Sequence, residues 1–350
     1  MPRSSTALAA ALLLIAVSPA PADDVADFYK GKRINLVVSY GPGGGYDVYG
    51  RIVARHIGKF IPGHPKVVVQ NMPGAGSLRG TNYLYKVAPR DGTTFGTFAR
   101  NMAMVGLLKT GQNVQFDPMK FTWIGSSTSY ANDSYLLVLR KDAKVKSIEE
   151  ARRPGGPPII LGSTAEGASS DATAILLRDW LGFNVKVIPG YTDSSVLFLA
   201  IERGEIDGRT VGLSSLNATK PEWLKPGGLM RALVQFGRAT RHPALPDAPT
   251  ARELARTAAD RNLIEIIELP YALSRPFAAP PDVPADRAKA LQQAFMAAHK
   301  DPEFLADAAK LGIDISPIGG ARVRELIGQI AKTPAEHLKR IEALITAAGG

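Results

Sequence analysis

Three consecutive glycines, Gly43, Gly44 and Gly45, stand between an apolar stretch at residues 34–40 and a segment at residues 46–57 that is typical of a helix. Glycine permits positive φ and close backbone approach, and a helix N-terminus adds unpaired N–H groups and the positive end of the dipole. The pattern predicts an anion-binding turn, although the same glycines also suit a tight turn without a ligand. No Gly-Lys-Ser/Thr follows, and Val48 stands where a dinucleotide motif has its third glycine, so both nucleotide-binding motifs are absent.

Several further residues are candidates for the same wall of a binding site. Tyr46 and Asp47 complete the glycine turn, and an aspartate in the first turn of a helix either caps it or accepts a hydrogen bond from a ligand. Ala75 and Gly76 follow the strand predicted at residues 66–70, and Arg100 follows the strand predicted at residues 93–98. In parallel sheets ligands lie at the carboxyl ends of the strands, where all of these residues are expected.

A second polar loop follows the strand predicted at residues 158–161 and precedes a helix predicted at residues 172–181. Its candidate ligand-binding residues are Ser163, Thr164, Glu166, Gly167, Ser169, Ser170 and Asp171. Two helix starts suited to anions on two separate sheets predict a cleft between them. The carboxylates of Glu166 and Asp171 would repel a nearby anion, so we expect them to face solvent, to cap the helix or to bind a ligand amine or hydroxyl.

Arginine side chains supply the remaining candidate contacts. The planar guanidinium of Arg100, Arg209 or Arg275 matches a carboxylate through two parallel hydrogen bonds. Any single one of these arginines is more typical of a surface or interdomain ion pair.

Catalytic, metal and cofactor sites find no support in the sequence. The chain has no cysteine, and none of its five histidines forms a metal pair at helical spacing, so we expect no metal. No Gly-x-Ser-x-Gly elbow is present, and we expect neither catalytic residues nor a cofactor. The net charge of +10 is spread along the chain without a Lys/Arg block, which argues against nucleic acid as a partner.

The chain of 350 residues begins with the pattern of an export signal. Arg3, an apolar run and an Ala-x-Ala end predict a signal peptide at residues 1–22 and a periplasmic protein; a membrane anchor is the alternative, but the run is short for a span. Strands alternate with helices up to about residue 125, which indicates parallel βαβ units. A new set of strands begins near residue 134, and the last eighty or so residues are mostly helical.

Several ordered motifs resemble the Bug/TctC family, the extracytoplasmic substrate-binding receptors of tripartite tricarboxylate transporters. The motifs lie at residues 38–47, 69–76, 88–92, 204–207, 242–250 and 279–284, and so cover essentially the whole mature chain. The resemblance implies an α/β, type II periplasmic-binding-protein fold with two domains joined by hinge strands around a ligand cleft. We expect residues 23–125 with 269–350 to form the first domain and residues 126–268 the second, with hinges near Ser126 and Leu269.

The resemblance further implies that a small organic carboxylate binds between the glycine turn and the loop at residues 162–171. The chain departs from the family pattern where Asp171 replaces a histidine, where Gly208-Arg209-Thr210 replaces an aspartate, and where Gly41 replaces a proline. We expect a monomeric receptor that delivers its ligand to integral-membrane transporter subunits without catalysis. The alternatives are an exported hydrolase that uses Asp47 with Ser163 or His56, and a receptor of the same fold used in signalling.

Overall fold

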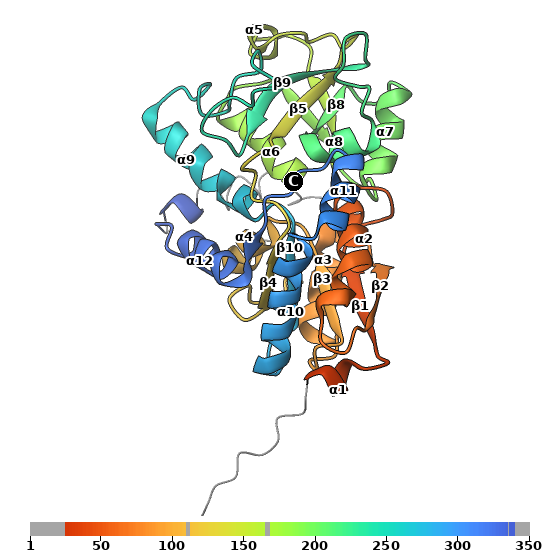
Figure 1. Ribbon diagram of the computed structural model, residues 1–350. Helices are drawn as coiled ribbons and strands as arrows, with labels where there is room; N and C mark the ends of the chain where they lie inside the picture. Colours follow the sequence, from red (N-terminus) through yellow and green to blue (C-terminus); the bar gives the residue numbers. More distant parts are fainter. Residues whose placement is uncertain (1–24, 110–112, 165–168, 335, 340–350) are drawn as a thin grey trace, which may run out of the picture.

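The computed structural model describes residues 25–109, 113–164, 169–334 and 336–339, and the predicted signal peptide lies outside these ranges. The chain forms a mixed α/β structure with two separate sheets, one below the other in Figure 1. In the described ranges, no helix combines the length and the apolar character that crossing a bilayer requires.

The first sheet has the strand order β11-β4-β10-β3-β1-β2. Its strands are β1 (Arg33–Val38), β2 (Lys66–Asn71), β3 (Thr94–Thr97), β4 (Thr122–Ser126), β10 (Pro276–Ala279) and β11 (Ile318–Gly319). The first three strands are parallel, as their alternation with helices predicts. Strand β10 returns from late in the chain and pairs antiparallel with β3 and β4, so the sheet as a whole is mixed.

Helices from both ends of the chain cover this sheet (Figure 1). They are α1 (Val25–Tyr29), α2 (Gly45–Ile57), α3 (Leu78–Lys86), α4 (Met102–Leu108), α10 (Ala285–Ala298), α11 (Pro302–Lys310) and α12 (Gly320–Ala331), with short 3₁₀ turns at Gly58–Phe60 and Ala75–Ser77. The buried side chains of Phe95, Phe277 and Phe295 lie within the core between sheet and helices. Burying one such side chain contributes about 1.5–3 kcal/mol to the stability of the fold. This core stabilises the strand and the helix on either side of the glycine turn.

The second sheet has the order β7-β6-β8-β5-β9 and a core of its own. Its strands are β5 (Tyr135–Arg140), β6 (Ile159–Gly162), β7 (Val185–Ile188), β8 (Gly208–Gly212) and β9 (Met230–Phe236). The helices around it are α5 (Ile148–Ala151), α6 (Ser169–Asp179), α7 (Ser194–Glu202), α8 (Leu213–Thr219) and α9 (Ala258–Glu268). Strand β6 runs parallel to β7 and β8, whereas β5 is antiparallel to β8 and β9.

Two crossings of the chain between the sheets lie next to each other. One leaves β4 at Ser126, and the other returns through a 3₁₀ turn at Leu269–Leu273 to β10. The Ser126 hydroxyl accepts a 3.0 Å hydrogen bond from the Arg275 amide, and the Ser127 amide donates a 3.0 Å bond to the Arg275 carbonyl. The predicted hinges coincide with these crossings, while the domain limits themselves stay a prediction.

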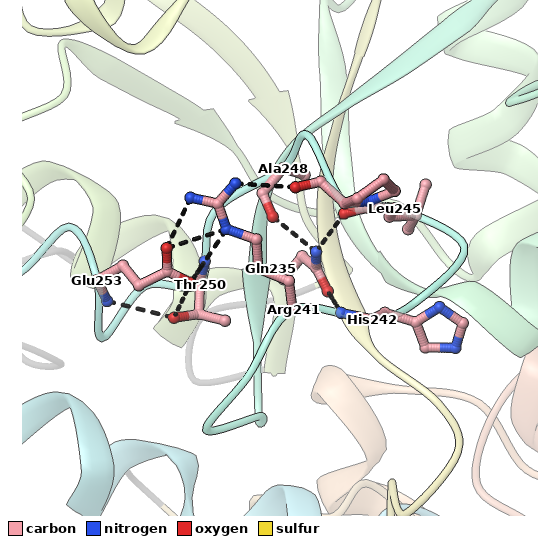
Figure 2. A network of polar contacts seen from close by, with 8 residues as sticks. Gln235, Arg241, His242, Leu245, Ala248, Thr250 and Glu253 are labelled. Atoms are coloured by element: carbon pink, nitrogen blue, oxygen red, sulfur yellow. Dashed lines mark hydrogen bonds and ion pairs between the residues drawn. The ribbon is translucent and has the colours of Figure 1, made fainter.

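The loop after β9 is fixed by one buried glutamine (Figure 2). The amide nitrogen of Gln235 donates to the carbonyls of Leu245 and Ala248, at 2.8 and 2.6 Å, and its oxygen accepts a 2.9 Å bond from the His242 amide. Arg241 and Glu253 close the same loop with an ion pair of 2.7 Å. The residues of the motif at 242–250 therefore have a structural role in this loop.

Candidate functional site

A cavity of about 50 Å³ lies between the two sheets. Its lining comes from both of them: Tyr40, Gly44, Gly45, Tyr46, Arg100, Tyr135, Thr164, Ser170, Asp193, Ser194 and Arg209. The candidates from the sequence that line it are Gly44, Gly45, Tyr46, Arg100, Thr164, Ser170 and Arg209. The glycine turn and the loop after β6 thus face the same space.

Asp47 organises the glycine turn from behind. Its carboxylate accepts hydrogen bonds from the Gly43 amide at 2.9 Å, from Arg51 at 2.8 Å and from the Asn71 amide group at 2.8 Å. Burial opposes ionisation, but these three donors hold the pKa of Asp47 below its usual value. The carboxylate is therefore charged and fully engaged, and it fixes the turn without lining the cavity.

The glycines of the turn also lie directly against residues of the other sheet. A β-carbon on Gly41 would lie 2.4 Å from a carboxylate oxygen of Asp193, and one on Gly43 would lie 2.8 Å from the Ser195 hydroxyl. A β-carbon on Gly45 would come within 2.0 Å of the Ser215 hydroxyl. Real side-chain atoms do not approach so closely, so glycine at these positions lets the two halves of the molecule meet around the cavity.

Arg100 enters the cavity from the end of β3 and is surrounded by tyrosines. Its guanidinium donates a 2.7 Å bond to the Tyr130 hydroxyl and lies 4.7 Å from the ring centre of Tyr135 and 4.9 Å from that of Tyr271. Arg100 is 3 % exposed. Aromatic faces attract a cation but carry no net negative charge, so its charge stays available to a ligand.

Tyr46 places a hydroxyl beside this guanidinium. The hydroxyl accepts a 3.0 Å bond from the Arg100 amide and a 3.4 Å bond from the Arg100 side chain. Burial would raise the pKa of Tyr46, but the charges of Arg100 and Arg275 hold it below its ordinary value. A tyrosine hydroxyl can donate its own proton as well as accept, so Tyr46 is placed to donate a hydrogen bond to a ligand in the cavity.

Arg209 approaches from β8 on the other side. It is 4 % exposed, donates 3.1 and 3.5 Å bonds to the carbonyls of Thr210 and Ser194, and lies 5.3 Å from the ring centre of Phe198. Burial lowers the pKa of Arg209 because the charged guanidinium is less stable away from water. The structure therefore brings Arg100 and Arg209, from different sheets, to one cavity.

A third buried guanidinium, that of Arg275, lies behind the glycine turn. It donates a 2.6 Å bond to the Ser215 hydroxyl and lies 4.8 Å from the ring centre of Tyr46. Among the ion pairs of the described residues, none joins Arg100, Arg209 or Arg275 to a carboxylate. The charge of Asp193 acts on Arg209 and that of Asp133 on Arg275, whereas Arg100 is surrounded by tyrosines alone. A buried cation is costly, and an anionic ligand would offset this cost at Arg100.

The second wall is described only in part. Ser170 and Thr164 line the cavity, and the Ser163 hydroxyl lies 2.9 Å from that of Ser170. Helix α6 begins at Ser169, earlier than the sequence predicts. Glu166 and Gly167 lie outside the described residues, and the side chains of Ser169 and Asp171 are likewise not described, so their predicted contacts stay predictions.

Some of the residues predicted from the sequence do not line the cavity, and some residues that line it were not predicted. Gly43, Ala75 and Gly76 do not line it; Gly76 instead accepts a 3.4 Å bond from the Tyr40 hydroxyl. The lining residues that the sequence did not single out are Tyr40, Tyr135, Asp193 and Ser194. Tyr40 stacks on Tyr46, with 4.8 Å between the ring centres. The sequence signal for it is its position at the end of the apolar stretch, just before the glycine-rich segment.

The residues of the hydrolase alternative are bound to other partners. His56 is buried beside Phe304, 3.1 Å from Asp307 and 3.6 Å from Asp301. His56, Asp301 and Glu303 could together hold a metal ion by their spacing, but the Lys59 ammonium already lies 3.0 Å from Glu303 and bonds Asp301 at 2.5 Å. Asp47 bonds within the glycine turn and Ser163 with Ser170, so these side chains form no triad.

Known proteins resemble this chain along most of its length. The family model described as tripartite tricarboxylate transporter family receptor matches residues 51–349. A UPF0065 protein from the gbd 5' region of Cupriavidus necator is 27% identical over 99% of this chain and 96% of its own length. The protein BugT of Bordetella pertussis is 27% identical over 67% of this chain and 70% of its own.

Solved structures share the fold. The periplasmic binding protein BugD superposes with a TM-score of 0.71 at 20% identity, covering 92% of this chain and 99% of its own. An adipate-bound protein of R. palustris gives a TM-score of 0.68 at 20% identity, with 91% and 97% covered. MatC of Rhodopseudomonas palustris with bound malate gives 0.64 at 19% identity, with 89% and 99% covered.

Proposed function

Because this chain belongs to the family of tripartite tricarboxylate transporter receptors, we propose that it is an exported receptor that captures a small dicarboxylate. The observation that carries this proposal is the pair Arg100 and Arg209, two buried cations that face one cavity from different sheets. A ligand with two carboxylates gives each guanidinium a bidentate partner. The malate and adipate bound by fold relatives are dicarboxylates, which supports the same class.

The size of the cavity favours a short acid. The volume of about 50 Å³ is the space open to the centre of a water molecule, and each enclosed water needs about 10–15 Å³ of it. The cavity therefore holds roughly four waters. A dicarboxylate of about four carbons displaces a comparable volume. We expect malate-sized acids to bind more tightly than adipate-sized ones.

Binding is coupled to closure in this proposal. The glycine turn contacts Asp193, Ser195 and Ser215 of the other half, and the crossings near Ser126 and Leu269 act as hinges. The receptor performs no catalysis and delivers its ligand to membrane subunits of a transporter. It acts as a monomer in the periplasm after removal of residues 1–22.

A thermal-shift screen of the mature protein against organic acids, followed by calorimetry, tests the proposal. A ligand at 100 times its Kd stabilises the folded state by about 2.7 kcal/mol, which is a readily measured shift. We expect dicarboxylates to shift the midpoint and monocarboxylates of the same length to have little effect. If only monocarboxylates or neutral solutes bind, the ligand class is wrong.

Arg209→Met sharpens this experiment because it separates binding from stability. The variant keeps the apolar stem but removes a buried cation, so we expect the ligand-free protein to be as stable as the parent or more stable. Dicarboxylate affinity should fall by about thirtyfold or more, since removing one partner of a buried charge pair costs at least about 2 kcal/mol. Arg241→Met, which removes the exposed pair with Glu253, is the matched control and should leave affinity unchanged.

The two alternatives make different predictions. A hydrolase would turn over an ester or amide panel and lose that activity in Asp47→Ala. A signalling receptor would bind the same acids, but its deletion would leave uptake of the labelled acid unchanged.

A further inference from the structure

A groove with a volume of about 690 Å³ lies on the half of the molecule that contains the first sheet. It is bordered by the start of β4, the loop after β10 and the loop before β3, whereas the cavity lies where β3 ends. Since β10 runs antiparallel to β3 and β4, the three borders of the groove share one end of the first sheet. The groove and the cavity therefore lie at opposite ends of this sheet.

Four cationic side chains from three separate segments of the chain line the groove. They are Lys86 at the end of α3, Arg90, Lys120 and Arg324 on α12. Among the described residues that line the groove, the one carboxylate is that of Asp282, which lies 2.6 Å from Arg90. The ion pairs of the described residues include none of Lys86, Lys120 and Arg324. Four cations against one carboxylate leave this basic groove with an excess of three positive charges.

The excess positive charge favours an anionic occupant. Like charges gathered in one groove repel one another, and this repulsion costs free energy unless a negative partner is present. Lys86, Lys120 and Arg324 are exposed, so their long side chains can reach a partner that lies in the groove. A positive surface also attracts a negative one at a distance and fixes its orientation.

Apolar side chains share the groove with the cations. Tyr85 and Met119 line it, and Met119 is 37% exposed. Val87, next to Lys86 in the sequence, is 67% exposed. Tyrosine, methionine and arginine are enriched where proteins bind proteins. A small inorganic anion would leave the apolar atoms uncovered, and a flat bilayer surface would not fill a concave groove, whereas an acidic stretch of polypeptide matches both the charge and the apolar surface.

We propose that the basic groove binds an acidic segment of a partner protein. Carboxylates of the segment pair with Lys86, Lys120 and Arg324, and its apolar side chains pack on Tyr85 and Met119. Because the groove and the cavity lie at opposite ends of the first sheet, a bound segment leaves the cavity unobstructed. The interaction needs no small ligand, so it goes beyond the proposed function and can fail without affecting it.

Fluorescence anisotropy with a labelled peptide tests this proposal on the whole mature protein. The probe is a short synthetic peptide in which glutamate alternates with leucine. We expect it to bind the unmodified protein and to bind Lys86→Glu/Lys120→Glu at least about tenfold more weakly. Each substitution turns an attraction into a repulsion, so the two together exceed the small effect of one exposed ion pair. Absence of binding to the unmodified protein would refute the proposal.

Lys30→Glu/Lys186→Glu is the matched control. Both lysines are exposed and lie outside the groove, one before β1 and the other on β7, and the pair changes the net charge by the same amount. This variant should bind the peptide as tightly as the unmodified protein does. Both double variants should keep the unfolding midpoint of the parent, because substitutions at exposed, unpaired positions change stability little. Equal weakening of peptide binding in the two variants would show attraction by net charge alone and would overturn the proposal.

Vesicles of phosphatidylglycerol represent the competing occupant, an anionic membrane surface. We expect Lys86→Glu/Lys120→Glu to change vesicle binding no more than the control variant does. If vesicles bind through Lys86 and Lys120 while the peptide does not bind, the occupant is a membrane and the proposal is wrong.

Discussion

Gly45→Ala separates closure of the cavity from folding of the chain. In the closed arrangement the added methyl group would lie 2.0 Å from the Ser215 hydroxyl and 3.1 Å from the Arg275 guanidinium. That hydroxyl also accepts the 2.6 Å bond from Arg275, so moving it aside breaks a buried contact. Overpacking of this kind costs about 1–3 kcal/mol, which corresponds to affinity lowered roughly 5- to 150-fold.

The same substitution should spare the ligand-free protein. Gly45 is the first residue of α2, where alanine is no worse a helix former than glycine. The clash with Ser215, which belongs to the other half, disappears once the halves separate. We would measure Kd for the tightest dicarboxylate by calorimetry and the unfolding midpoint without ligand. Weakened binding with an unchanged midpoint is the expected result.

Gly50→Ala is the matched control for this prediction. A β-carbon there would lie 2.6 Å from Val38 in β1, the strand beneath α2 in the same half, so the clash persists whether the cavity is open or closed. This variant should therefore lose stability without ligand. The reasoning fails if Gly45→Ala binds like the parent, or if it destabilises the ligand-free protein as much as Gly50→Ala does.

Two further predictions concern the core. Burial lowers the pKa of His299 to about 4 from 6.5, so the unfolded chain binds a proton that the folded protein refuses between these pH values, and stability should fall by up to about 3 kcal/mol as pH drops through that window. Urea unfolding at pH 7 and 4.5 checks this, and a loss no larger than that of His299→Gln would contradict it. Phe304→Ala should lower the free energy of unfolding by about 3–5 kcal/mol, measured with urea, because Phe304 is fully buried. Its neighbour Leu305 is 41% exposed, so Leu305→Ala should change the same quantity by no more than about 0.5 kcal/mol. Equal losses in the two variants would refute the burial argument.

The sequence predicts those parts of the fold that local patterns control. Strands β1, β2 and β3 appear as apolar runs followed by turns, and their parallel pairing follows from the helices between them. The antiparallel strand β10 joins the same sheet from nearly two hundred residues later, and no local pattern specifies such a partner. Helix α9 was missed although Thr257 and Asp260 form a capping pair, with the Thr257 hydroxyl accepting from the Asp260 amide at 3.0 Å.

The cavity was predictable where binding residues follow a strand. Arg100 and the glycine turn follow β3 and β1 and were found in this way. Asp193 precedes a helix and reads as an ordinary cap, and only its contact with Gly41 across the cavity shows its second position. Tyr135 sits at the start of β5 as one apolar residue among several. Contacts between distant halves of the chain determine the rest of the site.

The burial of Arg100 and Arg209 also decides how binding responds to the surroundings. Surface charges lose most of their attraction beyond about 8 Å at physiological ionic strength. Charges enclosed in protein are screened far less by salt. Discrimination between ligands with one and with two carboxylates should therefore persist at high salt concentration. In the proposed receptor, Arg100 and Arg209 would therefore distinguish ligands with two carboxylates from ligands with one at low and at high salt.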